Sequence, residues 1–182
     1  FRASVAEGYD YIEFDPKYTS DGEIVILHDH TLDRTARNSD GSRVEEGKKI
    51  YDTTLAEARS YDYGLWFDEK FRGEKIPLLR DLLEYACEVG IPVKVDNVWE
   101  HFPDEMKEKM FSIIEEYSDR LKVGFTCAKL ETLEMAAKRF PKADIHYDGG
   151  DLSAERLDEV AKIARGHHLY VWVCYDCEMT SW

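Results

Sequence analysis

Two carboxylates stand on one face of a predicted strand near the start of the chain. In the stretch 10–18, Glu13 and Asp15 alternate with Ile12 and Phe14, which is typical of a β-strand that has one polar face. Two unpaired charges would be prohibitively costly in a dry core. Carboxylates at positions i and i+2 of a strand converge on one point, so the spacing indicates a site for a hard divalent cation.

His28 ends a second apolar stretch, 24–30, and histidine is the side chain best suited to move protons near neutral pH. Together the two stretches read Gly-x-Asp-x-Ile-Glu-x-Asp over residues 8–15 and Asp-Gly-x-x-Val-x-x-His-Asp-x-x-Leu-x-Arg-Thr over residues 21–35. This long, ordered pattern resembles the glycerophosphodiester phosphodiesterase family. A weaker resemblance continues through most of the chain.

The chain departs from the family pattern in two places. The family's first barrel strand ends in a His-Arg-Gly motif that carries one of two catalytic histidines. That strand is expected just before Phe1, and the motif is absent. The family's third strand reads Glu-x-Lys, whereas residues 93–97 read Val-Lys-Val-Asp-Asn, so the acid and the base are exchanged.

The resemblance implies a metal centre and an acid–base residue, at strand ends where active sites of such barrels lie. We expect Glu13, Asp15 and Asp96 to bind Mg²⁺ or Ca²⁺, with Asp96 compensating for the missing Glu. Lys94 would then hold the substrate phosphate, and the other interpretation is a buried ion pair between Lys94 and Asp96 without metal. His28 is the predicted general acid or base.

Three further features of the sequence have alternative interpretations. Trp172 matches a family tryptophan and would wall the glycerol pocket, or it is a plain core residue. Asp29 is expected to brace the loop or orient a histidine. The C-x-x-C pair of Cys174 and Cys177 has no second pair nearby, and chance placement is favoured over a metal or redox role.

The bulk composition limits the classes of partner. A chain of 182 residues with 43% hydrophobic residues predicts one folded domain, 1–182. A net charge of −14 argues against nucleic acid and anionic membranes. It does not exclude the small-molecule phosphodiester that the resemblance implies, because a bound dication reverses the local sign of the charge. No membrane-spanning run or signal peptide is visible, and irregularly spaced cysteines favour a reduced, cytoplasmic protein. The oligomeric state is left open.

The rhythm of strands and helices predicts an α/β fold. Five barrel-type strands are expected to start at about residues 10, 91, 121, 144 and 168, separated by amphipathic helices. The pattern permits a doubly wound sheet or a barrel, and the resemblance favours a (β/α)₈ TIM barrel. Such a barrel needs about 250 residues, so we expect an incomplete one, with pieces missing at both ends. Residues 35–75 are predicted to be an active-site insertion whose aromatic cluster anchors it or walls the substrate.

The expected reaction is metal-dependent hydrolysis of glycerophosphodiesters to an alcohol and glycerol 3-phosphate. With only one of the two histidines present, this polypeptide is expected to be weak or inactive. One alternative is a non-catalytic barrel that binds phosphate or metal, which the exchange of Lys94 and Asp96 supports. The other is a phospholipase similar to sphingomyelinase D.

Overall fold

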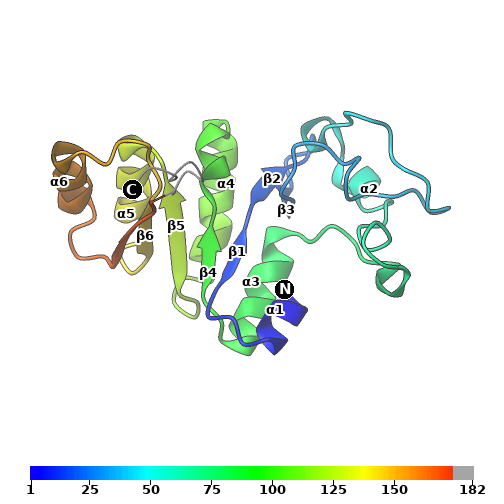
Figure 1. Cartoon of the computed structure of the whole chain (residues 1–182), viewed down its shortest axis with the longest axis horizontal. Helices are drawn as coiled ribbons and strands as arrows, with labels where there is room; N and C mark the ends of the chain where they lie inside the picture. Colours follow the sequence, from blue (N-terminus) through cyan, green and yellow to red (C-terminus); the bar gives the residue numbers. More distant parts are fainter. Residues whose placement is uncertain (174–182) are drawn as a thin grey trace, which may run out of the picture.

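The computed structural model describes residues 1–173. Its centre is a parallel sheet, in which the strands follow one another in space as they do along the chain (Figure 1). The strands are β1 (Ile12–Phe14), β4 (Val93–Val95), β5 (Val123–Cys127), β6 (Asp144–Tyr147) and β7 (Leu169–Val171). All five predicted barrel strands are therefore confirmed.

A helix or helical segment lies between each strand of the sheet and the next, as parallel connections require. The main helices are α3 (Leu79–Val89), α4 (Asp104–Glu115), α5 (Leu130–Arg139) and α6 (Ala154–Ile163), and a short α1 (Arg2–Ala6) precedes the sheet. Gly90 ends α3 with a φ of 70°, a conformation that glycine adopts without strain. Ser153 caps α6 by accepting a hydrogen bond from the Arg156 amide at 3.3 Å.

The two faces of the sheet differ because side chains alternate along each strand. Ile12 and Phe14 of β1, and Val93 and Val95 of β4, are buried in the main core with the apolar faces of the helices. The residue between each pair points to the other face. Glu13 stands directly beside Lys94 in the β1–β4 register, so the predicted alternation of polar and apolar side chains is confirmed.

An arm leaves the sheet after β1 and returns at α3 (Figure 1). It begins with the antiparallel pair β2 (Pro16–Tyr18) and β3 (Ile24–Ile26), and continues through η1 (Ile50–Asp52), α2 (Leu55–Ala58) and η2 (Glu69–Phe71). A second hydrophobic cluster holds the arm together. The boundaries 35–75 of the insertion stay a prediction.

The aromatic side chains of the arm fall into two groups. Tyr61 and Tyr63 pack against the second hydrophobic cluster, as an anchoring role requires. Trp66, Phe67 and Phe71 are exposed and contact one another at the far end of the arm, with ring centroids 5.7 and 5.8 Å apart. Only the first group anchors the insertion.

The stretch 10–18 differs from the single strand that its alternation predicts. β1 ends at Phe14, and β2 begins at Pro16 and pairs with β3. Proline lacks an N–H group and is tolerated as the first residue of a strand, so Pro16 can begin β2. Asp15 lies at the junction, between the sheet and the arm.

Candidate functional site

Three carboxylates meet where β1 and β4 end. Glu13 lies on β1, Asp15 follows it, and Asp96 follows β4. Each can offer an oxygen atom such that all three oxygens lie within 4.8 Å of one another. The Asp96 amide donates a 3.0 Å hydrogen bond to the carbonyl of Phe14, which ties the two strand ends together. We call Glu13, Asp15 and Asp96 the carboxylate trio.

The trio is electrostatically strained without a cation. Burial raises the pKa of Glu13, and the nearby charge of Asp15 raises it further. Burial also raises the pKa of Asp15, with Asp96 adding to the effect. A set of hard oxygen donors whose charges repel one another is the donor set that Mg²⁺ or Ca²⁺ prefers, so these residues fit a divalent cation.

Lys94 lies beside the trio and does not pair with it. Within residues 1–173 no ion pair joins Lys94 to Asp96; instead the Lys94 Nζ lies 4.8 Å from the centroid of the Trp172 ring. Trp172 is 48% exposed, so its interpretation as a plain core residue is wrong. Its Nε1 atom donates to Nδ1 of His146 at 3.3 Å. The indole therefore forms one wall beside Lys94.

His28 stands at the edge of the same site. Its side chain is 77% exposed, and its Nδ1 lies 2.8 Å from Oδ1 of Asp29. This hydrogen bond raises the pKa of His28, and the charge of Asp15 adds to the rise. Arg34 binds the same Asp29 carboxylate through two nitrogens and lowers the pKa of Asp29 to about 2. Asp29 thus does both things that were expected of it: it orients His28 and, through Arg34, it braces the loop.

Two charged residues at this site escaped the sequence analysis. Lys17 on β2 is fully buried, although its charge lies near Asp15 and Asp96. Asp148 directly follows β6 and accepts a hydrogen bond from the side chain of Asn97 at 3.3 Å. Burial raises the pKa of Asp148, and the charge of Asp96 adds to the rise. Asp96 was predicted because it follows a strand, and Asp148 meets the same criterion because it directly follows β6.

His146 lies deeper on the polar face of the sheet. Burial lowers its pKa to about 4, and the positive charge of Lys94 contributes. Its ring stacks on Tyr170 with centroids 4.5 Å apart. His146 is therefore a neutral, packed side chain near neutral pH.

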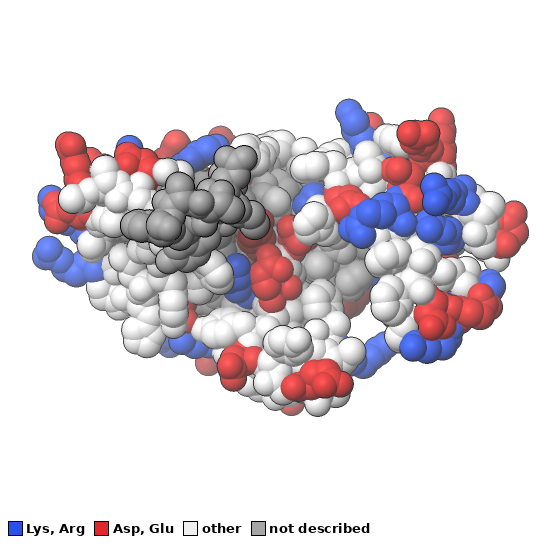
Figure 2. Space-filling view, viewed as in Figure 1, with Lys and Arg blue, Asp and Glu red and all other residues white. Residues whose placement is uncertain are grey.

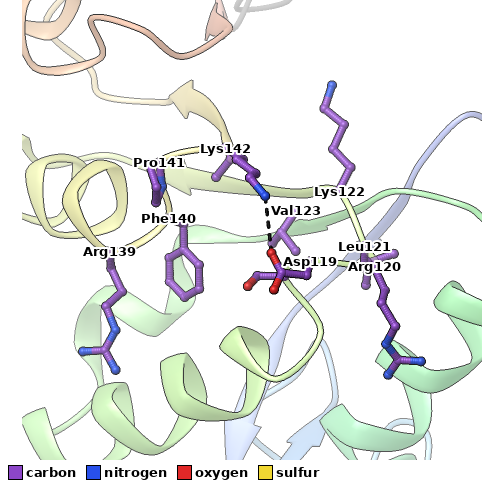
Figure 3. A pocket seen from close by; sticks show the side chains of 11 residues that line it. Asp119, Arg120, Leu121, Lys122, Val123, Arg139, Phe140, Pro141 and Lys142 are labelled. Carbon is purple, nitrogen blue, oxygen red and sulfur yellow. Dashed lines mark hydrogen bonds and ion pairs between the residues drawn. The ribbon is translucent and has the colours of Figure 1, made fainter.

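The site opens on the face of the molecule shown in Figure 2, where acidic side chains gather between the sheet and the arm. A separate pocket of about 410 Å³ lies elsewhere, between the α4–β5 and α5–β6 connections, at the opposite ends of the strands (Figure 3). Its cations already face carboxylates: Lys142 lies 3.3 Å from Asp119, and Lys122 lies 2.7 Å from Asp144. That pocket offers no free charge for a phosphate.

A model of the glycerophosphoryl diester phosphodiesterase family matches residues 1–169. The chain belongs to this family. It is 36% identical over 122 residues to the glycerophosphodiester phosphodiesterase of Caldanaerobacter subterraneus subsp. tengcongensis, covering 65% of this chain and 46% of that protein. It is 30% identical over 129 residues to the glycerophosphodiester phosphodiesterase of Bacillus altitudinis, covering 68% of this chain and 49% of that protein. The chain thus spans about half the length of these curated relatives.

Solved structures of the family share the fold. A phosphodiesterase from Oleispira antarctica, solved in complex with the product sn-glycerol-3-phosphate, superposes with a TM-score of 0.67 at 22% identity, covering 96% of this chain and 76% of that one. A glycerophosphoryl diester phosphodiesterase from Parabacteroides distasonis superposes with a TM-score of 0.62 at 19% identity. The superposition covers 88% of this chain and 51% of that one. The fold is of the (β/α)₈ barrel type, incomplete in this chain.

Two expectations concern other parts of the chain. None of the helices in residues 1–173 is long and apolar enough to cross a membrane. The pair Cys174 and Cys177 lies outside the described residues.

Proposed function

We propose that the protein is a metal-dependent phosphodiesterase that hydrolyses glycerophosphodiesters to an alcohol and glycerol 3-phosphate. One observation carries the proposal: a trio of carboxylates lies at the ends of two neighbouring parallel strands, with His28 at its edge. Carboxylates, a histidine and a lysine around one opening supply the groups that phosphodiester hydrolysis needs. Membership of the family supports the same reaction.

Glu13, Asp15 and Asp96 would hold the cation, Mg²⁺ or Ca²⁺. When bound, it would supply Lewis-acid polarisation of a non-bridging phosphate oxygen. Lys94 brings a positive charge to the same strand ends and would attract the phosphodiester anion. Trp172 lies against Lys94 and would cover the glycerol moiety, because an aromatic face suits the apolar side of a small polyol.

His28 would move the proton. Asp29 holds the Nδ1 side of the ring, which leaves Nε2 free to face the substrate. In its protonated form His28 would donate a proton to the departing alcohol oxygen, and the raised pKa keeps that form available near neutral pH. Arg34 supports this arrangement by holding Asp29 on its other side.

The test is release of glycerol 3-phosphate from glycerophosphocholine by the purified chain with Mg²⁺ or Ca²⁺, together with equilibrium binding of glycerol 3-phosphate. We expect turnover that His28→Ala abolishes, because His28 is the proposed proton donor to the departing alcohol oxygen. His30→Ala is the matched control, since His30 instead lies 3.1 Å from the Tyr51 hydroxyl.

A second candidate, a non-catalytic barrel that binds phosphate or metal, is favoured by the exchange of Lys94 and Asp96. The same experiment separates the two. Cation-dependent binding of glycerol 3-phosphate without any turnover that depends on His28 would establish the binding protein and overturn the hydrolase.

A cytoplasmic location belongs to this proposal as well. It is supported by Cys87 and Cys127, which are free thiols within residues 1–173, because reduced cysteines persist in reducing compartments. Labelling of both thiols in freshly lysed cells under denaturing conditions would test it, and their recovery in oxidised form would contradict it.

A further inference from the structure

His146 of β6 is a buried histidine that the proposed reaction does not use. It stands beside Tyr170 in the β6–β7 register, and the two rings are stacked with their planes 8° from parallel. Its Nδ1 atom accepts a 3.3 Å hydrogen bond from the indole N–H of Trp172. Within residues 1–173 its Nε2 atom has no hydrogen-bond partner. The bond to Trp172 is therefore the polar contact that its side chain keeps on burial.

Gly124 of β5 makes room for this histidine. A glycine weakens the interior of a strand and often marks a place where another group approaches closely. The φ of Gly124 is not positive, so its backbone would accept a larger residue without strain. A Cβ atom at this position would lie only 2.9 Å from Nε2 and 3.2 Å from Cδ2 of His146. The missing side chain therefore allows the imidazole to lie close against β5.

Trp172 depends on this support because nearly half of the residue is exposed. Its backbone amide donates a 2.8 Å hydrogen bond to the carbonyl of Tyr147, which fixes the backbone beside β6. That bond leaves the side chain free to choose among several rotamers. The hydrogen bond to His146 selects the rotamer in which the ring centroid lies 4.8 Å from Nζ of Lys94. The face of the indole is thus held against the lysine, in the geometry of a cation–π contact.

We propose that Gly124 and His146 position Trp172, and that the indole held in this way makes the site prefer a phosphate ester that carries glycerol over a phosphate that does not. This inference rests on the proposed function. Both are positioning residues that act through Trp172, because His146 is buried and Gly124 lies beneath it. The carbon atoms of glycerol can pack on the indole face, whereas inorganic phosphate has none to offer. Lys94 would attract the phosphate group of either ligand.

This role predicts a loss of affinity that depends on the ligand. His146→Leu removes the acceptor for the indole N–H and should weaken binding of glycerol 3-phosphate about fivefold, the contribution of one neutral hydrogen bond. Gly124→Ala should have a similar effect, because the added Cβ displaces the imidazole. Binding of inorganic phosphate should stay unchanged in both variants. General damage to the fold would instead weaken both ligands.

Two further variants are matched controls. His146→Asn keeps a hydrogen-bond acceptor near the position of Nδ1 and should retain most of the affinity for glycerol 3-phosphate. Gly150→Ala adds the same methyl group at another glycine whose φ is not positive, where a Cβ would meet no atom within 4 Å. If either control lost as much affinity for glycerol 3-phosphate as His146→Leu, the inference would fail.

The test is calorimetric titration of the wild type and the four variants at saturating Mg²⁺, with glycerol 3-phosphate and, separately, with inorganic phosphate. We expect His146→Leu and Gly124→Ala to lose affinity for glycerol 3-phosphate alone. Wild-type affinity for glycerol 3-phosphate in these two variants would overturn the inference. An equal loss for both ligands would overturn it as well, because it would show a structural role without selection for glycerol.

Two outcomes separate this inference from the proposed function. A wild type that binds neither ligand refutes the phosphodiester site itself, whereas a wild type that binds both, with His146→Leu and Gly124→Ala unchanged, refutes only the role of these two residues. If His146→Leu does not fold, NMR of the indole N–H of Trp172, assigned with Trp172→Phe, decides. This resonance should move in Gly124→Ala and not in Gly150→Ala, and a resonance that stays in place in Gly124→Ala would overturn the inference.

Discussion

Neutralising one acid of the carboxylate trio should change stability in opposite directions with and without a divalent cation. The perturbation is Asp96→Asn, which keeps the shape of the side chain and removes its charge. Asp96 follows β4 and is half-buried, and it contributes to the raised pKa values of Glu13 and Asp15. Without a cation the substitution relieves repulsion, and with a cation it removes a ligand.

The magnitude follows from the spacing of the oxygens. Two unit charges 4.8 Å apart interact by about 1 kcal/mol in a water-like dielectric. Asp96 faces two such charges, and the positive charge of nearby Lys94 offsets part of their effect. Asp96→Asn should therefore increase the free energy of unfolding in EDTA by about 1 kcal/mol. A tenfold loss of cation affinity would remove about 1.4 kcal/mol of the stabilisation at saturating Mg²⁺.

The assay is urea unfolding of both proteins in EDTA and in excess Mg²⁺, with Asp10→Asn as the control because Asp10 is an exposed acid outside the trio. We expect the variant to be more stable than wild type in EDTA and to gain less from Mg²⁺. A variant that is less stable than wild type in EDTA, or that gains equally from Mg²⁺, would refute the reasoning.

The remaining predictions concern protonation and a buried cap. The pKa of His146 is lowered to about 4 in the folded protein, whereas it is about 6.5 in the unfolded chain. As the pH falls below about 6.5, the unfolded chain therefore binds a proton at His146 before the folded protein does, and the free energy of unfolding should drop by about 2 kcal/mol between pH 7 and 4.5. Urea titrations of His146→Gln should lack this drop. An identical drop in this variant would show that the loss of stability does not come from His146. Asp29→Asn should lower the pKa of His28, measured by NMR titration, and an unshifted midpoint would count against their hydrogen bond. Glu100→Ala should cost about 3 kcal/mol of unfolding free energy, since the buried Glu100 accepts hydrogen bonds from the two backbone amides that precede α5 and from the Thr132 hydroxyl within α5. A loss below about 1 kcal/mol would contradict this.

Local patterns predicted the elements that position the site. The alternation around Glu13 and Asp15 identified which side chains leave the core, because a strand has a period of two residues. The sequence also carries the signal that ends α3, because Gly90 adopts the left-handed conformation that favours glycine. Asp96 lies near Glu13 and Asp15 because neighbouring parallel strands end on the same side of a sheet, and its role as a metal ligand stays a prediction.

Contacts between distant segments could not be predicted in the same way. Trp172 and Lys94 lie far apart in the sequence, and periodicity carries no information about which side chain covers which. The burial of Lys17 depends on the pairing of β2 with β3, which a strand ending at Pro16 would not form. Charge alone would have placed this lysine in solvent.

The most direct test of the carboxylate trio as a metal centre is anomalous scattering from a crystal of this protein grown with Mn²⁺, a stand-in for Mg²⁺ with the same preference for oxygen ligands. The account predicts an anomalous peak among the oxygens of Glu13, Asp15 and Asp96, at about 2.1 Å from each bound oxygen. Carboxylates paired with lysine or arginine side chains, with no peak between them, would contradict it.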